Sequence, residues 1–401
     1  MRPLLFLTVL SASLAFAQDE AAKALLQTFW EFPDRPELLN AIQSTFKLED
    51  LKKGTAVAGF GEDFLFAIET ASEPKLVVDG KRPTSMRRVR DTTFWAAPGR
   101  LEAGRHHWFH YVVDGKVFGG RTDLAAYGPD SYEQPGVPKG TLHGKFTHTS
   151  KLYAGMTSDY WVYVPAQYDG NTPAALMVWH DGQGLVTRDG RMRLQIVSDN
   201  LIHKKLMPVT IHVFIAPGKL GDKDMRGATY NPVDDKYPRL LRDELLPEVE
   251  TKWKIRKDAY SRAVAGGSSG GISAFNIAWH MPDQFARVHS HRGSFTSIAW
   301  KPGEQEGGDI YPFRVRKQPK RNIRVWLQDG SNDLENTHGS WPLQNIALAN
   351  SLKMQGYDFA LSWGEGTHDN AHGDAELPRS LTWLWREYDP SKTEQQFIPD
   401  P

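Results

Sequence analysis

Two serines flanked by glycines directly follow a short apolar run in the second half of the 401-residue chain. The apolar run covers residues 263–265, the glycine turn covers residues 266–271, and a segment with helical spacing of apolar residues follows. A serine at a glycine turn between a strand and a helix is typical of the nucleophile elbow, G-x-S-x-G. The glycines let the strand and the helix pass closely, and the free N–H groups at the helix start can stabilise an oxyanion. The stretch therefore predicts a serine nucleophile.

The glycine turn fits the elbow in two registers. One makes Ser268 the nucleophile, between Gly266 and Gly270, and the other makes it Ser269. Ser268 is the first choice, because the apolar run ends at Ala265 and Ser268 then lies at the tip of the turn. Such a short motif recurs by chance, so the hypothesis needs catalytic partners further along the chain.

An acid is expected after the serine, because a serine hydroxyl needs a base and the base needs an orienting group. In chains with this elbow the order is serine, acid, histidine. The apolar strand 323–327 is followed by Asp329 and Asp333. Asp333 is the first choice, since it lies beyond the Gly330 turn and can reach over the edge of the sheet. Asp329 suits a turn-orienting role better, and it and Glu335 remain alternatives.

The base is expected after the last strand, predicted at residues 359–363. A glycine-rich loop follows that contains His368 and His372. His368 is the first choice, because the surrounding glycines offer a mobile platform, and His372 is the second. The spacing of the pair also resembles half of a zinc site, but zinc needs both ligands on one helical face plus a third ligand. The glycines argue against a helix here, so we predict neither a metal site nor another cofactor.

An oxyanion hole needs two N–H donors, and the residue after the nucleophile, Ser269, supplies the first. The second should come from a loop after an early strand. The apolar run 174–179 ends in such a loop, in which Gln183 is the first choice and Gly184 the next. His180, in the same loop, is a candidate for contacting the substrate.

Alternating strand-like and helical segments from about residue 146 onward predict a mostly parallel, doubly wound α/β sheet. Between residues 54 and 147, short strand-like runs are separated by turn signals such as Asp114-Gly115, which predicts a small antiparallel β-sandwich. The predicted organisation is as follows: signal peptide, 1–17; N-terminal helical arm, 18–53; β-sandwich, 54–147; catalytic α/β domain, 148–390; C-terminal tail, 391–401.

Composition and the N-terminus narrow the class of protein. The chain has 48 basic and 48 acidic residues and no basic run, so neither a nucleic acid nor an anionic membrane is expected as a partner. It has no cysteine, which excludes disulfides, thiolate catalysis and thiolate metal sites. A basic start, an apolar run over residues 4–16 and the Ala15-Phe16-Ala17 cleavage pattern predict a signal peptide. We therefore expect a secreted or periplasmic protein without a membrane anchor.

Residues 160–388 resemble the enterochelin (enterobactin) esterases, in the esterase-D and feruloyl-esterase branch of the α/β-hydrolases. The resemblance rests on these motifs: YWVYVP at 160–165, WHDGQ at 179–183, AGGSSGG at 265–271, HRGSF at 291–295 and GEGTH at 364–368. The family patterns A-G-x-S-x-G-G and G-x-G-G-H support Ser268 as nucleophile and His368 as base. Such enzymes often carry an N-terminal immunoglobulin-like or glycogen-binding-like domain, to which residues 54–147 are similar.

The chain departs from the family pattern near the expected pocket. Where the relatives read nearer R-S-x-E-Y-D, this chain has Thr229 and Asn231 at the acidic positions, and Thr367 replaces a motif glycine. The resemblance makes Arg226 and Arg292 candidates for holding an acidic or catecholate group of a substrate.

Two functions follow as hypotheses. The first is a secreted serine esterase that works through an acyl-enzyme on a small-molecule or polysaccharide-linked ester; a siderophore trilactone and feruloyl or acetyl esters of plant polysaccharide both remain open. The second is a non-catalytic carbohydrate- or ligand-binding protein that keeps the fold and uses the β domain. The sequence predicts no oligomeric state.

Overall fold

The chain divides at Tyr132 into two units with separate hydrophobic cores. The computed structural model describes residues 8–399. The first unit runs to Tyr132 and also contains Ala371–Glu376, and the second contains Glu133–Asn370 and the chain from Leu377 onward. The start of the predicted signal peptide lies outside the described residues, and its later part falls within helix α1 (Thr8–Glu31).

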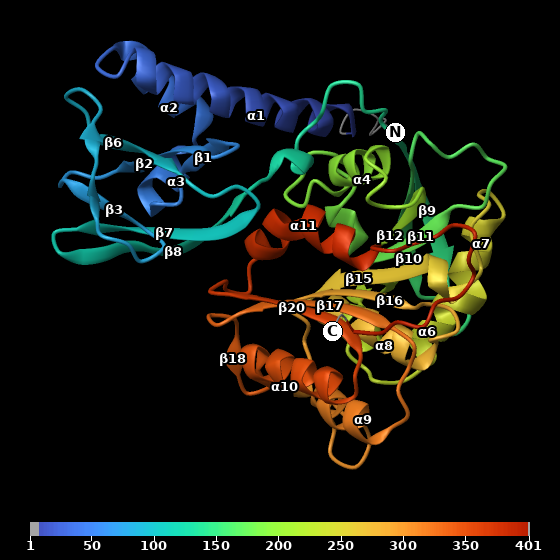
Figure 1. Cartoon of the computed structure of the whole chain (residues 1–401). Helices are drawn as coiled ribbons and strands as arrows, with labels where there is room; N and C mark the ends of the chain where they lie inside the picture. Colours follow the sequence, from blue (N-terminus) through green and yellow to red (C-terminus); the bar gives the residue numbers. More distant parts are fainter. Residues whose placement is uncertain (1–7, 400–401) are drawn as a thin grey trace. The chain divides into compact units, whose positions relative to one another are not determined.

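The first unit consists of three N-terminal helices and two four-stranded antiparallel sheets (Figure 1). One sheet has the order β1-β2-β6-β5 and the other β4-β3-β7-β8. The bounds are α1 (Thr8–Glu31), α2 (Pro36–Thr45), α3 (Leu48–Lys53), β1 (Val57–Phe60), β2 (Asp63–Glu69), β3 (Pro74–Val78), β4 (Thr84–Ser85), β5 (Arg87–Arg88), β6 (Phe94–Arg100), β7 (Arg105–Val113) and β8 (Lys116–Ala126).

Strand β2 is buried on both faces, because it separates two apolar clusters. Side chains alternate along a strand, so Phe64 and Phe66 join a core with Phe109 of the second sheet. Leu65 and Ala67 point the other way and pack with the apolar residues of the three helices. The predicted helical arm is therefore part of the packing of this unit.

The second unit is built on a ten-stranded mixed sheet. Its parallel part has the order β12-β11-β15-β16-β17-β20, and β10 pairs antiparallel with both β12 and β9. The bounds are β9 (Thr141–Thr149), β10 (Thr157–Val164), β11 (Ala175–His180), β12 (Thr210–Ile215), β13 (Lys219–Leu220), β14 (Lys223–Asp224), β15 (Arg262–Gly267), β16 (Arg287–His291), β17 (Arg324–Gly330) and β20 (Asp358–Gly364). The short β18 (Glu335–Asn336) and β19 (Gly339–Ser340) pair only with each other.

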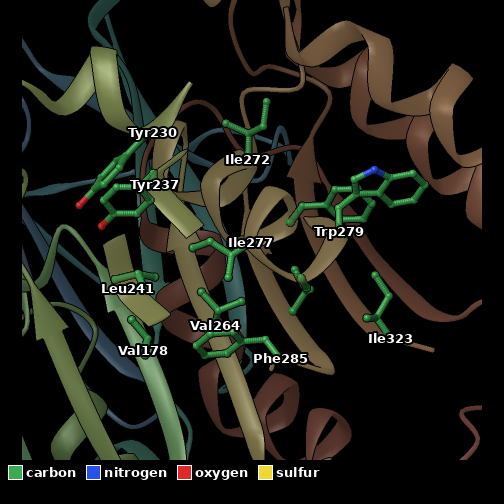
Figure 2. Packing of buried hydrophobic residues seen from close by; sticks show 14 of the residues in the cluster. Val178, Tyr230, Tyr237, Leu241, Val264, Ile272, Ile277, Trp279, Phe285 and Ile323 are labelled. Carbon is green, nitrogen blue, oxygen red and sulfur yellow. The ribbon is translucent and has the colours of Figure 1, made fainter. Parts of the chain in front are cut away.

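Helices cover both faces of this sheet, because its central strands are apolar on both sides. Val178 and Val264 face the cluster that holds α8, as Figure 2 shows, whereas Met177 and Ala263 face a second cluster with α4 and α11. The bounds are α4 (Leu194–His203), α5 (Arg226–Tyr230), α6 (Lys236–Leu240), α7 (Leu246–Glu250), α8 (Ser269–His280), α9 (Tyr311–Lys317), α10 (Trp341–Met354) and α11 (Ala371–Leu384).

Two element boundaries differ from the sequence-based expectation. Most of β9 lies within the range predicted for the β-sandwich, yet it pairs with β10 of the large sheet. A proline is favoured in the first turn of a helix, yet the last helix begins at Ala371 and contains Pro378 in its interior. A proline inside a helix loses one backbone hydrogen bond, but Leu377 and Leu381 are buried in the core beside it. Tertiary packing thus overrides the local signal.

Within residues 8–399, no helix combines the length and the apolar character that crossing a lipid bilayer requires.

Candidate active site

Ser268 occupies a sharp turn between β15 and α8. Its φ of 56° and ψ of −123° are unusual for a residue other than glycine. Its N–H donates to the carbonyl of His291 at 2.9 Å, which ties the turn to the end of β16. A Cβ added to Gly266 would lie 2.5 Å from backbone atoms of Gly270, so the strand and the helix can pass only with glycine there. The elbow predicted from the glycine spacing is present.

The structure brings Ser268, His368 and Asp333 into one hydrogen-bonded row. Nε2 of His368 lies 2.9 Å from Oγ of Ser268, and its Nδ1 lies 2.5 Å from Oδ1 of Asp333. The three side chains come from the β15–α8 turn, the loop after β20 and the loop after β17. This order is that of a nucleophile, a base and a group that orients the base.

Asp329 and Asp333 have different environments. Asp329 is fully buried and accepts hydrogen bonds from the N–H of Gly330 and from Nδ2 of Asn345, each at 2.8 Å. Burial, together with the neighbouring Asp333, raises the pKa of Asp329. Burial opposes the ionised form of Asp333 too, but hydrogen bonds from His368 and Asp329 outweigh it and lower the pKa of Asp333. Glu335 is exposed on β18. Asp333 is therefore the charged group that contacts the imidazole.

His372, the second choice for the base, has other partners. It lies inside α11, where its ring centroid is 5.4 Å from that of His106 and its Nε2 is 3.3 Å from Oε1 of Glu376. His368 precedes the helix, so the two histidines do not share a helical face. No group of His, Asp and Glu side chains in the described part of the chain is arranged to hold a metal ion.

Arg292, predicted to bind the substrate, contacts the loop that carries His368. It is only 8% exposed. Its Nη1 donates to the backbone carbonyl of His368 at 2.8 Å, and its Nη2 donates to Oδ1 of Asn370. The guanidinium is therefore engaged by the loop that carries His368, and its contact with a substrate stays a prediction.

His180, predicted to contact the substrate, is buried and hydrogen-bonded within the fold. It is 3% exposed. Its Nδ1 lies 3.0 Å from the carbonyl of Ala265, and its Nε2 lies 3.4 Å from Oγ of Ser273. Burial lowers the pKa of His180 to about 4, so the ring is neutral at pH 7. It links the ends of β11 and β15 to α8.

The turn after β11 passes beside the first turn of α8. A Cβ added to Gly270 would lie 3.1 Å from Oδ2 of Asp181. The N–H of Gly184 is engaged, since it donates to the carbonyl of Asp181 at 3.1 Å. Within residues 8–399 the N–H groups of Gln183 and Ser269 have no hydrogen-bond acceptor. These are the two N–H groups expected to form the oxyanion hole.

Arg226 lies on α5 and forms a two-point ion pair with Asp181. Nε and Nη2 lie 2.6 and 2.8 Å from the two carboxylate oxygens. These hydrogen bonds to Asp181 raise the pKa of Arg226. The side chain remains 32% exposed, so it keeps a surface that a ligand can reach.

At the substituted positions, Thr229 and Asn231 both donate side-chain hydrogen bonds to nearby backbone carbonyls. The hydroxyl of Thr229 donates to the carbonyl of Met225 at 2.9 Å, and Nδ2 of Asn231 donates to the carbonyl of Gly227 at 3.3 Å. Both residues are buried, so they stabilise the local helix.

Two residues beside Ser268 were not predicted from the sequence. Oγ of Ser294 lies 3.2 Å from Oγ of Ser268, and Nε1 of Trp341 lies 3.1 Å from Oγ of Ser294. The HRGSF motif contains Ser294, but nothing in that motif points to a contact with the nucleophile. Trp341 begins α10 without any sequence signal for chemistry.

Comparisons with known proteins agree with this geometry. The model of the Esterase family ("Putative esterase") matches residues 155–383. The iron(III) enterobactin esterase of Escherichia coli K12 is 28% identical over 141 residues, which are 33% of this chain and 32% of that protein. The protein of that name from E. coli O6:H1 is 28% identical over 138 residues, with the same shares. The aligned part thus spans about a third of these curated relatives.

Among solved structures, an enterobactin esterase from Shigella flexneri matches 82% of this chain and 96% of its own, with 19% identity and a TM-score of 0.56. A ferric enterobactin esterase from Salmonella typhimurium matches 84% of this chain and 97% of its own, with 18% identity and a TM-score of 0.53. At this identity the likeness concerns the fold, which is of the α/β-hydrolase type with a mixed sheet. Because the family match covers more than half of the sequence, the chain belongs to the Esterase family.

Proposed function

We propose that this protein hydrolyses carboxylic esters through an acyl-enzyme formed on Ser268. One observation carries the proposal. The imidazole of His368 lies 2.9 Å from Oγ of Ser268 through Nε2 and 2.5 Å from the carboxylate of Asp333 through Nδ1. A serine hydroxyl is unreactive at neutral pH unless a positioned base takes its proton. If these hydrogen bonds only stabilised the fold, Ser268 would not need a strained backbone with positive φ at the tip of the turn.

The proposed reaction has two steps. In the first, Oγ of Ser268 attacks the ester carbonyl while its proton moves to Nε2 of His368, which then protonates the leaving alcohol. In the second, water attacks the acyl-enzyme with His368 again as base. Asp333 accepts the Nδ1–H hydrogen bond throughout, which keeps the imidazole in the correct tautomer and stabilises its cation.

The N–H groups of Ser269 and Gln183 are the proposed oxyanion donors. The first lies at the start of α8, where the helix dipole adds a partial positive charge. The second lies in the turn that is tied to α5 by the Asp181–Arg226 ion pair. Each donor of this kind contributes about a hundredfold to a thousandfold in turnover in serine hydrolases.

For the substrate we propose an ester of the siderophore kind. The E. coli relatives are iron(III) enterobactin esterases, and a Shigella structure was solved in the presence of enterobactin. Arg226 is the proposed contact for an acidic or catecholate group, because its guanidinium stays partly exposed beside the turn of Gln183. Enterobactin, methyl ferulate and acetylated xylan, compared at equal concentrations, separate this substrate from feruloyl and acetyl esters.

Hydrolysis of p-nitrophenyl acetate and labelling by a fluorophosphonate test the reaction itself. We expect turnover by the wild type and covalent labelling at Ser268. Ser268→Ala should lose both, whereas Ser269→Ala, which keeps its N–H, should retain both. Absence of turnover and of labelling in the wild type would favour the non-catalytic binding protein.

Export and the identity of the β unit are also proposals. The basic start, apolar run and Ala15-Phe16-Ala17 pattern support a cleaved signal peptide. Mass spectrometry of the protein from the periplasm or medium should find an N-terminus at Gln18. The two facing antiparallel sheets of the first unit support an immunoglobulin-like domain.

A further inference from the structure

Ser294 touches the atom that would react. Its Oγ lies 3.2 Å from Oγ of Ser268, and its N–H donates to the carbonyl of Ser268 at 3.0 Å. The residue is only 1% exposed, in the segment that follows β16. Backbone and side chain therefore both hold Ser294 against the nucleophile, away from bulk water.

The direction of each hydrogen bond follows from the donors and acceptors present. The indole N–H of Trp341 can only donate, so Oγ of Ser294 accepts from it at 3.1 Å. Nδ1–H of His368 donates to the carboxylate of Asp333, which leaves Nε2 as the acceptor for the hydroxyl of Ser268. The hydroxyl of Ser268 therefore donates its hydrogen bond to His368, and its Oγ accepts a hydrogen bond from the hydroxyl of Ser294.

We propose that Ser294 is a further catalytic residue, whose hydroxyl donates to Oγ of Ser268, and that Trp341 is the positioning residue that orients this hydroxyl. The inference deepens the ester hydrolysis proposed above and rests on it. The resulting chain of donors runs from Trp341 through Ser294 and Ser268 to His368.

The donor stabilises charge on Oγ in both steps without losing its proton. During acylation the Ser268 proton goes to Nε2 of His368, the new bond joins Oγ to the acyl carbon, and the carbonyl electrons move to the oxyanion. During deacylation the bond between the acyl carbon and Oγ breaks, and Oγ takes a proton from the His368 imidazolium. In each case Oγ carries partial negative charge as the bond changes, and hydrogen bonds to a charged atom are the strong ones.

The surroundings of Trp341 support a fixed geometry. Nδ2 of Asn345 lies 3.0 Å from the carbonyl of Gly293 and 3.0 Å from that of Trp341, so the same amide holds the segment before Ser294 and the first turn of α10. The indole also meets the ring of His368 nearly edge-on, with centroids 5.7 Å apart. Asn345 is fully buried, so these contacts are shielded from water.

The first test is Ser294→Ala, assayed with p-nitrophenyl acetate and with a fluorophosphonate. We expect kcat and the labelling rate of Ser268 to fall together by about tenfold to a hundredfold, as for loss of a hydrogen bond to a charged atom, with KM within twofold of the wild type. The matched control is Ser290→Ala. Ser290 is also a buried serine, on β16, but its hydroxyl has no hydrogen-bond partner among the described residues. Its kcat should stay within twofold.

The second test separates a chemical role from a packing role. Trp341→Phe keeps an aromatic ring against His368 but removes the N–H that orients Ser294. We expect about a threefold or larger loss in the labelling rate. The double variant Ser294→Ala with Trp341→Phe should be no slower than Ser294→Ala alone, because Trp341 acts through Ser294. If the two substitutions acted through independent packing effects, the fold-losses of the single variants would multiply in the double variant.

The outcomes distinguish this inference from the function on which it depends. An active wild type with Ser294→Ala within twofold of it overturns the role of Ser294 and leaves the esterase proposal intact. A wild type with neither turnover nor labelling overturns both. If Ser294→Ala does not fold, Trp341→Phe decides: an unchanged labelling rate overturns the proposal.

Discussion

Nη1 of Arg292 donates a hydrogen bond to the backbone carbonyl of His368, with 2.8 Å between the two atoms. Arg292 follows β16, and its own N–H donates to the carbonyl of Gln328 on β17 at 2.6 Å. The loop that carries the imidazole is therefore fixed to the same sheet edge as Ser268. A glycine-rich loop would otherwise leave the position of His368 poorly defined.

Replacement of Arg292 by lysine should lower kcat by about tenfold to a hundredfold, because misplacement of a catalytic group by about 1 Å has effects of this size. Lysine presents a single point charge and cannot reach both the His368 carbonyl and Asn370 as the guanidinium does. The matched control is Arg191→Lys, because Arg191 contacts Asp369 in the same loop from the solvent side. Steady-state kinetics with equal losses in both variants would contradict this role.

Asp333→Asn should lower kcat/KM at pH 7 by about a thousandfold to ten-thousandfold, as for loss of the orienting carboxylate in a serine triad. Asp329→Asn should cost less than about tenfold. The raised pKa of Asp329 favours its neutral form, which an amide resembles, whereas the pKa of Asp333 is lowered. Comparable losses in the two variants would show that the acid is shared or misassigned.

Gln183→Pro should lower kcat by about a hundredfold or more, because it removes one N–H from the proposed oxyanion hole. Gln183→Ala removes the exposed side chain and keeps the N–H, so its kcat should stay near that of the wild type. Circular dichroism and the unfolding midpoint of both variants check that the turn survives. If both variants lose activity alike, the side chain of Gln183 matters and the backbone assignment is wrong.

Gly266→Ala should reduce the free energy of unfolding by about 1–3 kcal/mol, the usual cost of overpacking. Its Cβ would lie 2.5 Å from backbone atoms of Gly270, which cannot move aside as a flexible side chain would. Gly184→Ala is the control, because nothing lies within 4 Å of a Cβ added there. Urea unfolding measures both variants, and an unshifted midpoint for Gly266→Ala would refute the close approach of strand and helix.

Three buried histidines predict lower stability in mild acid. Burial lowers the pKa of His180 to about 4 and the pKa values of His212 and His289 to about 3, from an ordinary value of 6.5. Below pH 6.5 the unfolded chain binds protons that the folded protein excludes, so stability falls as the pH falls from 6.5 toward these values. Each group contributes about 1.4 kcal/mol per pH unit in this window.

Urea unfolding at pH 7, 6 and 5 tests this dependence. The urea concentration at the unfolding midpoint should fall with each step. In the His289→Gln variant, one proton fewer is taken up on unfolding, so the free energy of unfolding should change less steeply with pH. His338 is exposed, so His338→Gln should leave the slope unchanged. A midpoint that stays level from pH 7 to 5 would mean that these histidines are protonated in the folded state.

Much of the fold was readable from local patterns. The apolar runs at residues 174–179, 323–327 and 359–363 predict strands, and β11, β17 and β20 cover nearly all of these residues. The order of strands in the sheet was not readable, because pairing joins segments far apart in sequence. Strand β9 is an example. Its residues are typical of a surface strand, and only the pairing with β10 shows that it belongs to the large sheet.

The sequence by itself determined the elbow of Ser268, because the need for glycine at a close approach is a local property, and chain order then pointed to Asp333 and His368. Only the tertiary structure decided the contacts of Arg292, His180 and Ser294. A guanidinium, an imidazole and a hydroxyl can each bind substrate, hold a loop or support a nucleophile. Which of these they do depends on the backbone groups that distant strands bring within about 3 Å of them, and no spacing along the chain records that distance.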